Sequence, residues 1–287
     1  MTEGPDPAVA VITIVSGRHA HLRRQLDAFA HSTLAPLVHV VVAMDDPHIG
    51  GLVDDCAPHG HPVSLVHVRG GGDTLPLAEA RNTGAAEAIS RGAGLLVFLD
   101  VDCIPDSALL ARYLRAATDA GPRLLFCGPV TYLPEGQPTF DARELRRFAA
   151  PHPARPAPRD DSVEFSSAMT LFWSLSFAVV APDWEDIGGF HTGYEGYGGE
   201  DTDFALCAQS KGCRIAWVGG AHAYHQHHPV SDPPVEHLRD ILRNARVFYR
   251  RWGFRPMEGW LNGFADLGLI AYDAADDAWK ATGRVSP

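Results

Sequence analysis

Residues Leu95–Asp102 read LLVFLDVD, five apolar residues followed by two aspartates with one valine between them. A short run without polar residues is typical of a strand buried on both faces of a parallel sheet. Asp100 and Asp102 stand at positions i and i+2, so in extended backbone their carboxylates point to the same side. Ligands of open parallel sheets bind at the carboxyl ends of the strands. The stretch therefore predicts an α/β fold and the place of its functional site, although a helix-capping turn is the simpler alternative for the two aspartates.

Similar apolar runs on the N-terminal side predict three more buried strands. They are Val9–Val15 (VAVITIV), Val38–Ala43 (VHVVVA) and Val63–Val68 (VSLVHV), and a helix is predicted over residues 75–91. Strands that alternate with helices in this way predict a mostly parallel sheet that helices cover on both faces.

The pattern changes after Val130. Residues 134–161 are rich in proline and charge and show no periodicity, which predicts a mobile surface loop suited to act as a lid. A strand-like run, Leu171–Val180, follows. An amphipathic helix is predicted to begin at Asp232, with prolines in its first turn, and to end before Gly253.

Composition and charge narrow the class of protein. The 287 residues are 46% hydrophobic and carry a formal net charge of −11, which does not favour a nucleic-acid partner. No apolar run approaches the ~18–20 residues of a membrane helix, and no signal peptide is expected; peripheral membrane contact stays compatible with these features. The five cysteines show no CxxC spacing and predict reduced thiols in a cytoplasmic protein.

Two further clusters carry chemical groups. Residues 194–203 read YEGYGGEDTD, in which glycines allow a tight turn and carboxylates then begin a helix, predicted over Asp203–Lys211. One of these carboxylates can act as a general base, or the group is only an acidic helix start. Residues 222–228 read HAYHQHH. In extended backbone His225 and His227 face the same side and either or both can bind a metal, with a solvated turn as the alternative.

The segments DVDCIP, GYGGEDTD and YHQH, in this order, resemble the GT-A glycosyltransferases of family 2 and their galactosyltransferase relatives. The likeness runs from Val9 to about Trp252. It implies one continuous GT-A domain with a mostly parallel nucleotide-binding sheet and a smaller acceptor-side part. Residues 1–130 would form the nucleotide-sugar-binding half, and residues 131–287 the acceptor-binding and catalytic half with the C-terminal helices.

The resemblance also implies roles for the acidic and histidine residues. Asp102 would be a direct metal ligand, Asp100 a ribose or metal contact, and His225 or His227 the remaining ligand. Asp201 would be the catalytic base, and Glu200 would position the acceptor. The expected nucleotide contacts are Ser16 and Arg18 after the first strand, Asp45 or Asp46 at the nucleobase, and Arg81 with Asn82 beside the nucleotide.

The function that the resemblance implies is a metal-dependent, inverting sugar transfer. The donor would be a nucleotide sugar linked to UDP, the metal Mn²⁺ or Mg²⁺, and the acceptor a carbohydrate, lipid or small molecule. Two other classes stay open. A nucleotidyltransferase would need a phosphate loop rich in glycine and lysine, but SGRHAHLRR after the first strand has a single glycine. A non-catalytic nucleotide-sugar-binding module would need no base, and Asp201 is present.

Overall fold

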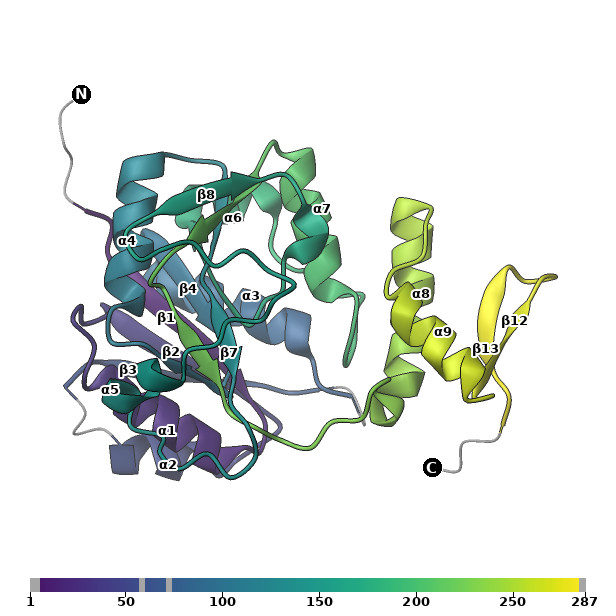
Figure 1. Ribbon diagram of the computed structural model, residues 1–287, viewed down its shortest axis with the longest axis horizontal. Coiled ribbons are helices and arrows are strands. Elements are labelled where there is room, and N and C mark those ends of the chain that lie inside the picture. Colours follow the sequence, from purple (N-terminus) through teal and green to yellow (C-terminus); the bar gives the residue numbers. More distant parts are fainter. Residues whose placement is uncertain (1–5, 57–59, 71–73, 284–287) are drawn as a thin grey trace.

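The computed structural model describes residues 6–56, 60–70 and 74–283, so the outermost residues of the two predicted halves lie outside the described part. An eight-stranded sheet in the order β3-β2-β1-β4-β9-β6-β10-β8 forms its centre (Figure 1). These strands are β1 Val9–Val15, β2 Val38–Met44, β3 Val63–Val68, β4 Leu95–Leu99, β6 Leu124–Cys127, β8 Val163–Ser166, β9 Ser176–Val180 and β10 Arg214–Val218. The helices are α1 His19–Phe29, α2 Ile49–Cys56, α3 Leu77–Ser90, α4 Leu109–Ala120, α5 Ala142–Leu145, α6 Ala181–Ile187, α7 Glu200–Ser210, α8 Leu238–Trp252 and α9 Glu258–Asp266.

The sheet is mostly parallel, as the sequence predicts. Strands β3, β2, β1 and β4 pair in parallel, and β10 is parallel to β6. Strand β9 is antiparallel to both β4 and β6, and β8 is antiparallel to β10 at the edge. Only the second half of the predicted run Leu171–Val180 belongs to β9, because residues 169–171 form a 3-10 turn.

Helices cover both faces of the sheet and enclose its core. Every residue of β1, β2 and β4 is buried. Helix α3 lies so close to β1 that a Cβ at Gly84 would stand 2.6 Å from Ile12 Cγ2, so glycine permits this packing. On the other face, Leu110 and Tyr113 of α4 pack against the same sheet. This packing is the reason why the strand sequences are continuously apolar.

A second, three-stranded sheet brings the histidine segment to the end of β4. It consists of β5 Cys103–Pro105, β11 Ala223–His225 and β7 Val130–Tyr132, with β11 in the middle. In its register His225 lies opposite Cys103 on one side and Tyr132 on the other. Since Cys103 follows Asp102 directly, this sheet places His225 beside the DVD segment.

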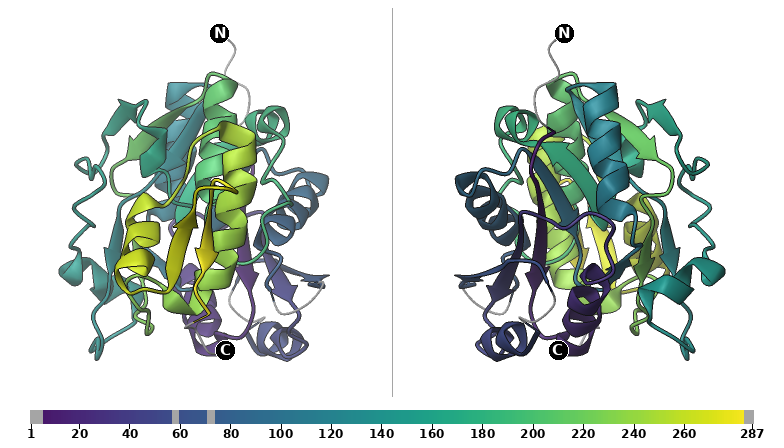
Figure 2. Two further views of the ribbon diagram at one scale, coloured as in Figure 1. Left: turned by 90° about the vertical axis from the view of Figure 1, so that its right-hand side faces the viewer. Right: turned by 90° about the vertical axis from the view of Figure 1, so that its left-hand side faces the viewer.

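The C-terminal elements form a small core of their own. Helices α8 and α9 and the hairpin of β12 Ile270–Asp273 and β13 Ala278–Ala281 share the buried residues Leu238, Ile241, Leu242, Leu261, Phe264 and Ile270. This part lies beside the main body in Figure 1 and in front of it in the left view of Figure 2.

Three predicted elements differ in their bounds. The helix expected from Asp232 begins at Leu238, after a 3-10 turn at Val235–His237, because Pro233 and Pro234 lie in the chain that leads to it. Helix α7 begins at Glu200, three residues early, since Gly199 adopts a φ of 89° and turns the chain there. The predicted loop 134–161 contains α5, whose Leu145 is fully buried.

Two predictions about bonding and membrane spans can be compared with the structure. All five cysteines are free thiols, as the sequence predicts. Within the described ranges, no helix combines the length and the apolar character that crossing a membrane requires.

Candidate active site at the end of strand β4

The carboxylates of Asp100 and Asp102 contact different partners. Arg81 Nη2 lies 3.2 Å from Asp100 Oδ1, whereas Asp102 faces His225, His228 and Arg18. The chain turns directly after β4, and the Cys103 amide donates to the Asp100 carbonyl at 2.8 Å. The extended backbone that the sequence prediction assumed therefore ends at Leu99, and the two aspartates serve two neighbouring clusters.

The first cluster can hold a metal ion. Ligand atoms of Asp102, His225 and His228 all lie within 4.8 Å of one another. The Nε2 atoms of His225 and His228 stand 3.5 and 3.6 Å from the two Asp102 carboxylate oxygens. Burial lowers the pKa of His225, which keeps its imidazole neutral and able to donate a lone pair. Asp102 Oδ1 is buried and has no hydrogen-bond partner among the described residues, as expected for an atom that binds a cation.

The prediction that His227 shares this face with His225 needs correction. Strand β11 ends at His225, and the next residue, Gln226, is fully buried. The Gln226 amide donates to the Asp102 carbonyl at 2.7 Å, and Arg24 donates to the Gln226 side chain at 3.1 Å. The chain turns at this anchor, so that His227 is exposed and His228 returns to Asp102. The roles of Gln226 and His228 were not predicted, because the alternation of side chains along a strand does not continue past a turn.

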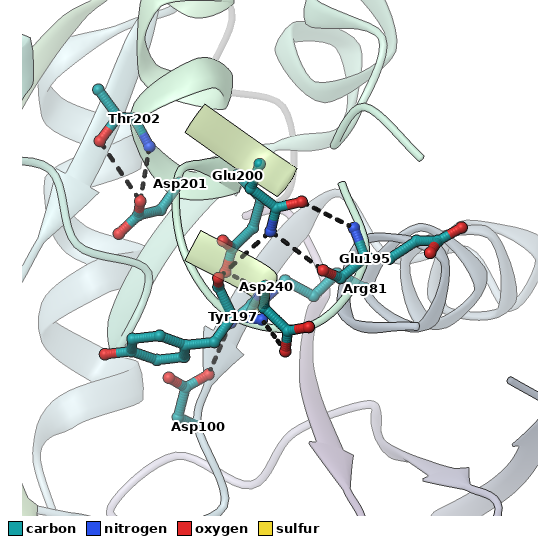
Figure 3. A network of polar contacts seen from close by, with 9 residues as sticks. Arg81, Asp100, Glu195, Tyr197, Glu200, Asp201, Thr202 and Asp240 are labelled. Carbon is teal, nitrogen blue, oxygen red and sulfur yellow. Dashed lines mark hydrogen bonds and ion pairs between the residues drawn. The ribbon is translucent and has the colours of Figure 1, made fainter. Parts of the chain in front are cut away.

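The second cluster is centred on Arg81, a buried residue of α3. Its guanidinium lies 3.2 Å from Asp100 and 3.4 Å from Glu200 Oε1. Figure 3 shows how side chains from α3, the end of β4 and the start of α7 converge here. Arg81 therefore connects the DVD segment with the GGED segment. Its neighbour Asn82 is similarly engaged, since its amide exchanges two 2.8 Å hydrogen bonds with the backbone of Phe190.

Glu200 and Asp201 differ in exposure and partners. Burial, together with the negative charge of Asp201, raises the pKa of Glu200 to about 7. Asp201 is half-buried, and its Oδ1 accepts the Thr202 amide at 2.7 Å. Burial also raises the pKa of Asp201. Asp201 is thus the more accessible of two carboxylates whose basicity exceeds that of a surface acid.

The predicted nucleotide contacts of the first two strands lie in loops at one edge of the sheet. Asp46 accepts from the Gly17 amide and from His19 Nε2, both at 2.8 Å, and Asp45 accepts from the Gly70 amide at 2.8 Å. These two aspartates tie together the loops that follow β1, β2 and β3. Ser16 and Arg18 belong to the first of these loops, and Arg18 reaches Asp102 at 3.6 Å. Four of the predicted nucleotide contacts, Ser16, Arg18, Asp45 and Asp46, therefore lie at this edge, and Arg18 connects them with the metal-binding cluster.

Known sequences are similar to parts of this chain. The family described as the N-terminal domain of galactosyltransferase matches residues 160–229, which include α7 and the histidine segment. Validoxylamine A glucosyltransferase of Streptomyces hygroscopicus subsp. limoneus is 26% identical over 223 residues, 72% of this chain and 49% of the relative. The chain therefore spans about half the length of this curated relative.

Solved structures share the fold at low sequence identity. GalNAc-T7 with UDP, GalNAc and Mn²⁺ has a TM-score of 0.55 at 13% identity over 92% of this chain and 57% of that one. The mannosyltransferase PcManGT of Pyrobaculum calidifontis, in complex with GDP-Man and Mn²⁺, has a TM-score of 0.54 at 19% identity, covering 87% and 66%. S. aureus TarS 1–349 with UDP-GlcNAc has a TM-score of 0.57 at 13% identity, covering 90% and 80%. The described part of the chain therefore has the GT-A fold of these glycosyltransferases.

The third acidic residue of the GGEDTD segment is structural. Asp203 is fully buried and accepts hydrogen bonds from Tyr194 Oη at 3.1 Å, Arg251 Nε at 2.6 Å and Trp252 Nε1 at 2.6 Å. These bonds join the start of α7 to the end of α8. Asp203 is therefore committed to holding the C-terminal part and does not compete with Asp201 for a catalytic role.

Tyr197 belongs to an aromatic stack. Its ring centroid lies 4.6 Å from that of His237 and 5.6 Å from that of Trp260, with nearly parallel planes. The Tyr197 backbone is held by Asp240 and Asn244 of α8. The C-terminal helices thus fix the ring that follows the glycine turn, which the sequence alone did not reveal because His237 and Trp260 carry no motif.

Proposed function

We propose that the chain transfers a sugar from a nucleoside diphosphate sugar, with uridine as the base, to the hydroxyl group of an acceptor. The observation that carries this proposal is the cluster of Asp102, His225 and His228 at the carboxyl end of β4. One carboxylate and two imidazoles suit Mn²⁺ better than Mg²⁺, which prefers oxygen ligands. The solved relatives bound to UDP and Mn²⁺ or to GDP-Man and Mn²⁺ support this donor class.

The residues that would hold the metal are those of this cluster, and its orphaned Asp102 Oδ1 fits the role. When bound, a divalent cation supplies positive charge that stabilises the departing nucleoside diphosphate. Arg18, 3.6 Å from Asp102, adds a second positive charge on the nucleotide side. Asp100 is held by Arg81 and is assigned to the ribose contact rather than to the metal.

Asp201 acts in this proposal as the general base. The Thr202 amide fixes Oδ1, and the other carboxylate oxygen accepts the proton of the acceptor hydroxyl. The hydroxyl oxygen bonds to the anomeric carbon from the face opposite the diphosphate, whose C–O bond breaks, so that the configuration inverts. Burial raises the pKa of Asp201, which strengthens it as a proton acceptor near neutral pH. Glu200, fixed by Arg81, positions the acceptor beside it.

The acceptor in this proposal is a carbohydrate, a lipid or a small molecule with a free hydroxyl group. The Tyr197 ring, which is 39% exposed, offers an apolar surface for it next to Asp201. A cytoplasmic location also stays a prediction from the sequence.

A thermal-shift screen tests the proposed donor class. UDP, GDP and their sugars are added with and without Mn²⁺, and the melting temperature is followed. A nucleotide at 100 times its dissociation constant should stabilise the protein by ~2.7 kcal/mol. Stabilisation by UDP and UDP-sugars only with Mn²⁺ supports the proposal. A screen in which no nucleotide stabilises the protein, or in which Mn²⁺ has no effect, would count against it.

The histidine cluster gives a prediction that separates neighbouring residues. Replacing His228 with alanine should weaken Mn²⁺ binding by about ten-fold or more, because a ligand beside Asp102 is lost. His227→Ala is the matched control and should leave Mn²⁺ affinity nearly unchanged, since His227 is exposed. Titration of Mn²⁺ followed by electron paramagnetic resonance measures both. Equal effects of the two substitutions would indicate that this segment is a solvated turn and not a metal site.

A second prediction concerns the buried Glu200. Its folded-state pKa of about 7 exceeds that of an unfolded glutamate, so its contribution to stability is lost as the pH rises through that value. Glu200→Gln removes this effect and should stabilise the protein at pH 8 by about 1–3 kcal/mol relative to wild type, with little difference at pH 4. Urea unfolding at both pH values measures it. Glu195→Gln, at an exposed carboxylate of the same loop, is the control. An equal effect of Glu200→Gln at both pH values would contradict the assigned pKa.

A further inference from the structure

A buried arginine that forms no ion pair with the described residues lies outside the site discussed above. Arg155 is 7% exposed, and its Nε, Nη1 and Nη2 atoms are buried without a hydrogen-bond partner among the described residues. The Cys127 thiol lies next to this guanidinium and is at most a weak acceptor for it; burial raises the pKa of the thiol to about 12, so that it is neutral and provides no compensating charge. A guanidinium carries only donors and stays charged at any physiological pH. A buried cation of this kind is stabilised by an anionic partner.

Two tryptophan rings flank this guanidinium. Its Cζ lies 4.9 Å from the Trp217 ring centroid and 5.2 Å from that of Trp173. Trp217 is fully buried, and its Nε1 is a further donor without a partner in the described chain. Trp173 is half-buried and lies toward the surface. The unpaired groups gathered here are all donors, which suits a ligand that offers several acceptor oxygens.

A row of rings connects this group of donors with the metal-binding cluster. The His225 ring lies 4.6 Å from the Tyr132 ring, Tyr132 lies 5.6 Å from His152, and His152 lies 5.1 Å from Trp173. Tyr132 is 46% exposed. The row therefore forms a partly exposed aromatic wall that begins at a candidate metal ligand and ends at Arg155.

The backbone around Arg155 is fixed to the same wall. The Ala150 amide donates to Thr131 Oγ1 at 2.9 Å, and the His152 amide donates to the Val130 carbonyl at 2.9 Å. These bonds attach the proline-rich segment to β7, next to β11. Arg155 is buried in a segment in which Ala154, Ala157 and Arg159 are exposed. Its position is thus set by the fold.

The position of Arg155 distinguishes the acceptor from the donor. Trp217 and Cys127 belong to β10 and β6, whereas Arg18, Asp45 and Asp46 follow β1 and β2. In the sheet order, β4 with its aspartates lies between these two groups of strands. Arg155 is therefore on the opposite side of the metal-binding cluster from the predicted nucleotide contacts.

We propose that Arg155 binds an oxyanion, a carboxylate or a phosphate, that the acceptor carries, with the wall of Tyr132, His152 and Trp173 supporting the rest of that molecule. This inference rests on the proposed function, because it names the class of its acceptor. Access requires the Trp173 ring or the Arg155 side chain to turn, a side-chain change that is common at binding sites.

Ligand binding to the full chain tests the inference with inorganic phosphate, glucose and glucose 6-phosphate as probes. Tryptophan fluorescence is followed with UDP and Mn²⁺ at saturation, which fills the donor site, and again without them. Wild type should bind phosphate saturably and should bind glucose 6-phosphate at least about ten-fold more tightly than glucose. Arg155→Gln should lose about ten-fold or more of both affinities, and Arg155→Lys should retain part of them. Arg159→Gln, an exposed arginine of the same segment, is the matched control and should behave as wild type.

The outcomes separate this inference from the proposed function. Phosphate binding that depends on Arg155, together with UDP affinity that does not, supports the acceptor site. Loss of UDP affinity in Arg155→Gln would assign Arg155 to the donor and overturn the inference. The inference would also be overturned if wild type did not bind phosphate saturably, or if it bound glucose and glucose 6-phosphate with equal affinity. These two results come from wild type alone and do not depend on the folding of the variants. Failure of UDP and Mn²⁺ to bind wild type would instead contradict the proposed function.

Discussion

Replacing Asp201 with asparagine should lower kcat by ~10²-fold or more and leave the affinity for the nucleotide sugar nearly unchanged. Asparagine keeps the size of the side chain and can still accept the Thr202 amide at Oδ1. It cannot accept the proton of the acceptor hydroxyl at neutral pH, so the loss belongs to the chemical step. Initial rates at saturating donor and acceptor, combined with donor binding by calorimetry, measure the two quantities separately.

Two neighbouring carboxylates serve as controls for Asp201. Asp203→Asn should lower the melting temperature, because three donors lose a charged acceptor, but should leave kcat of the folded enzyme close to that of wild type. Glu200→Gln should raise KM for the acceptor more than it lowers kcat. Near-normal transfer by Asp201→Asn would mean that the base lies elsewhere or that the reaction retains the anomeric configuration.

Asp102→Ala should abolish the stabilisation that UDP provides in the presence of Mn²⁺. The substitution removes the one carboxylate of the cluster and leaves two imidazoles without their anionic partner. At 100 times its dissociation constant, UDP should add ~2.7 kcal/mol to wild type and nothing measurable to the variant. Thermal shift with and without Mn²⁺ measures this difference.

Asp119→Ala is a suitable control for Asp102, because this exposed aspartate of α4 has no partner in the site. It should respond to UDP and Mn²⁺ as wild type does. The melting temperature of Asp102→Ala without ligand shows whether the fold persists. Unchanged, Mn²⁺-dependent UDP binding by a folded Asp102→Ala would remove Asp102 from the metal site.

Strands β1, β2 and β4 were predictable because each is a continuous or nearly continuous apolar run in the local sequence. LLVFL of β4 has no polar residue, and all five residues are buried. The insertion of β9 between β4 and β6 was not predictable in the same way. Its direction is fixed by pairing with strands that are distant in the chain, and an apolar run carries no information on which neighbour it will join.

The site was predictable to the extent that strand ends and motifs place residues. Asp100 and Asp102 follow β4 directly; Arg81 joins the first to Glu200, and the second faces His225. His228, and not His227, lies beside Asp102 because the Gln226 amide is hydrogen-bonded to the Asp102 backbone. This contact joins segments that are far apart in the sequence. The two ion pairs of Arg81 and the lone guanidinium of Arg155 are likewise products of tertiary packing. No local sequence pattern predicts these contacts.

The most direct test of the metal-dependent account is a crystal of the protein grown with UDP and MnCl₂. An anomalous difference map recorded at the manganese absorption edge locates the ion without reference to any sequence motif. One strong peak is expected within coordination distance of Asp102, His225 and His228. A map with ordered UDP and no manganese peak at these three residues would contradict the account.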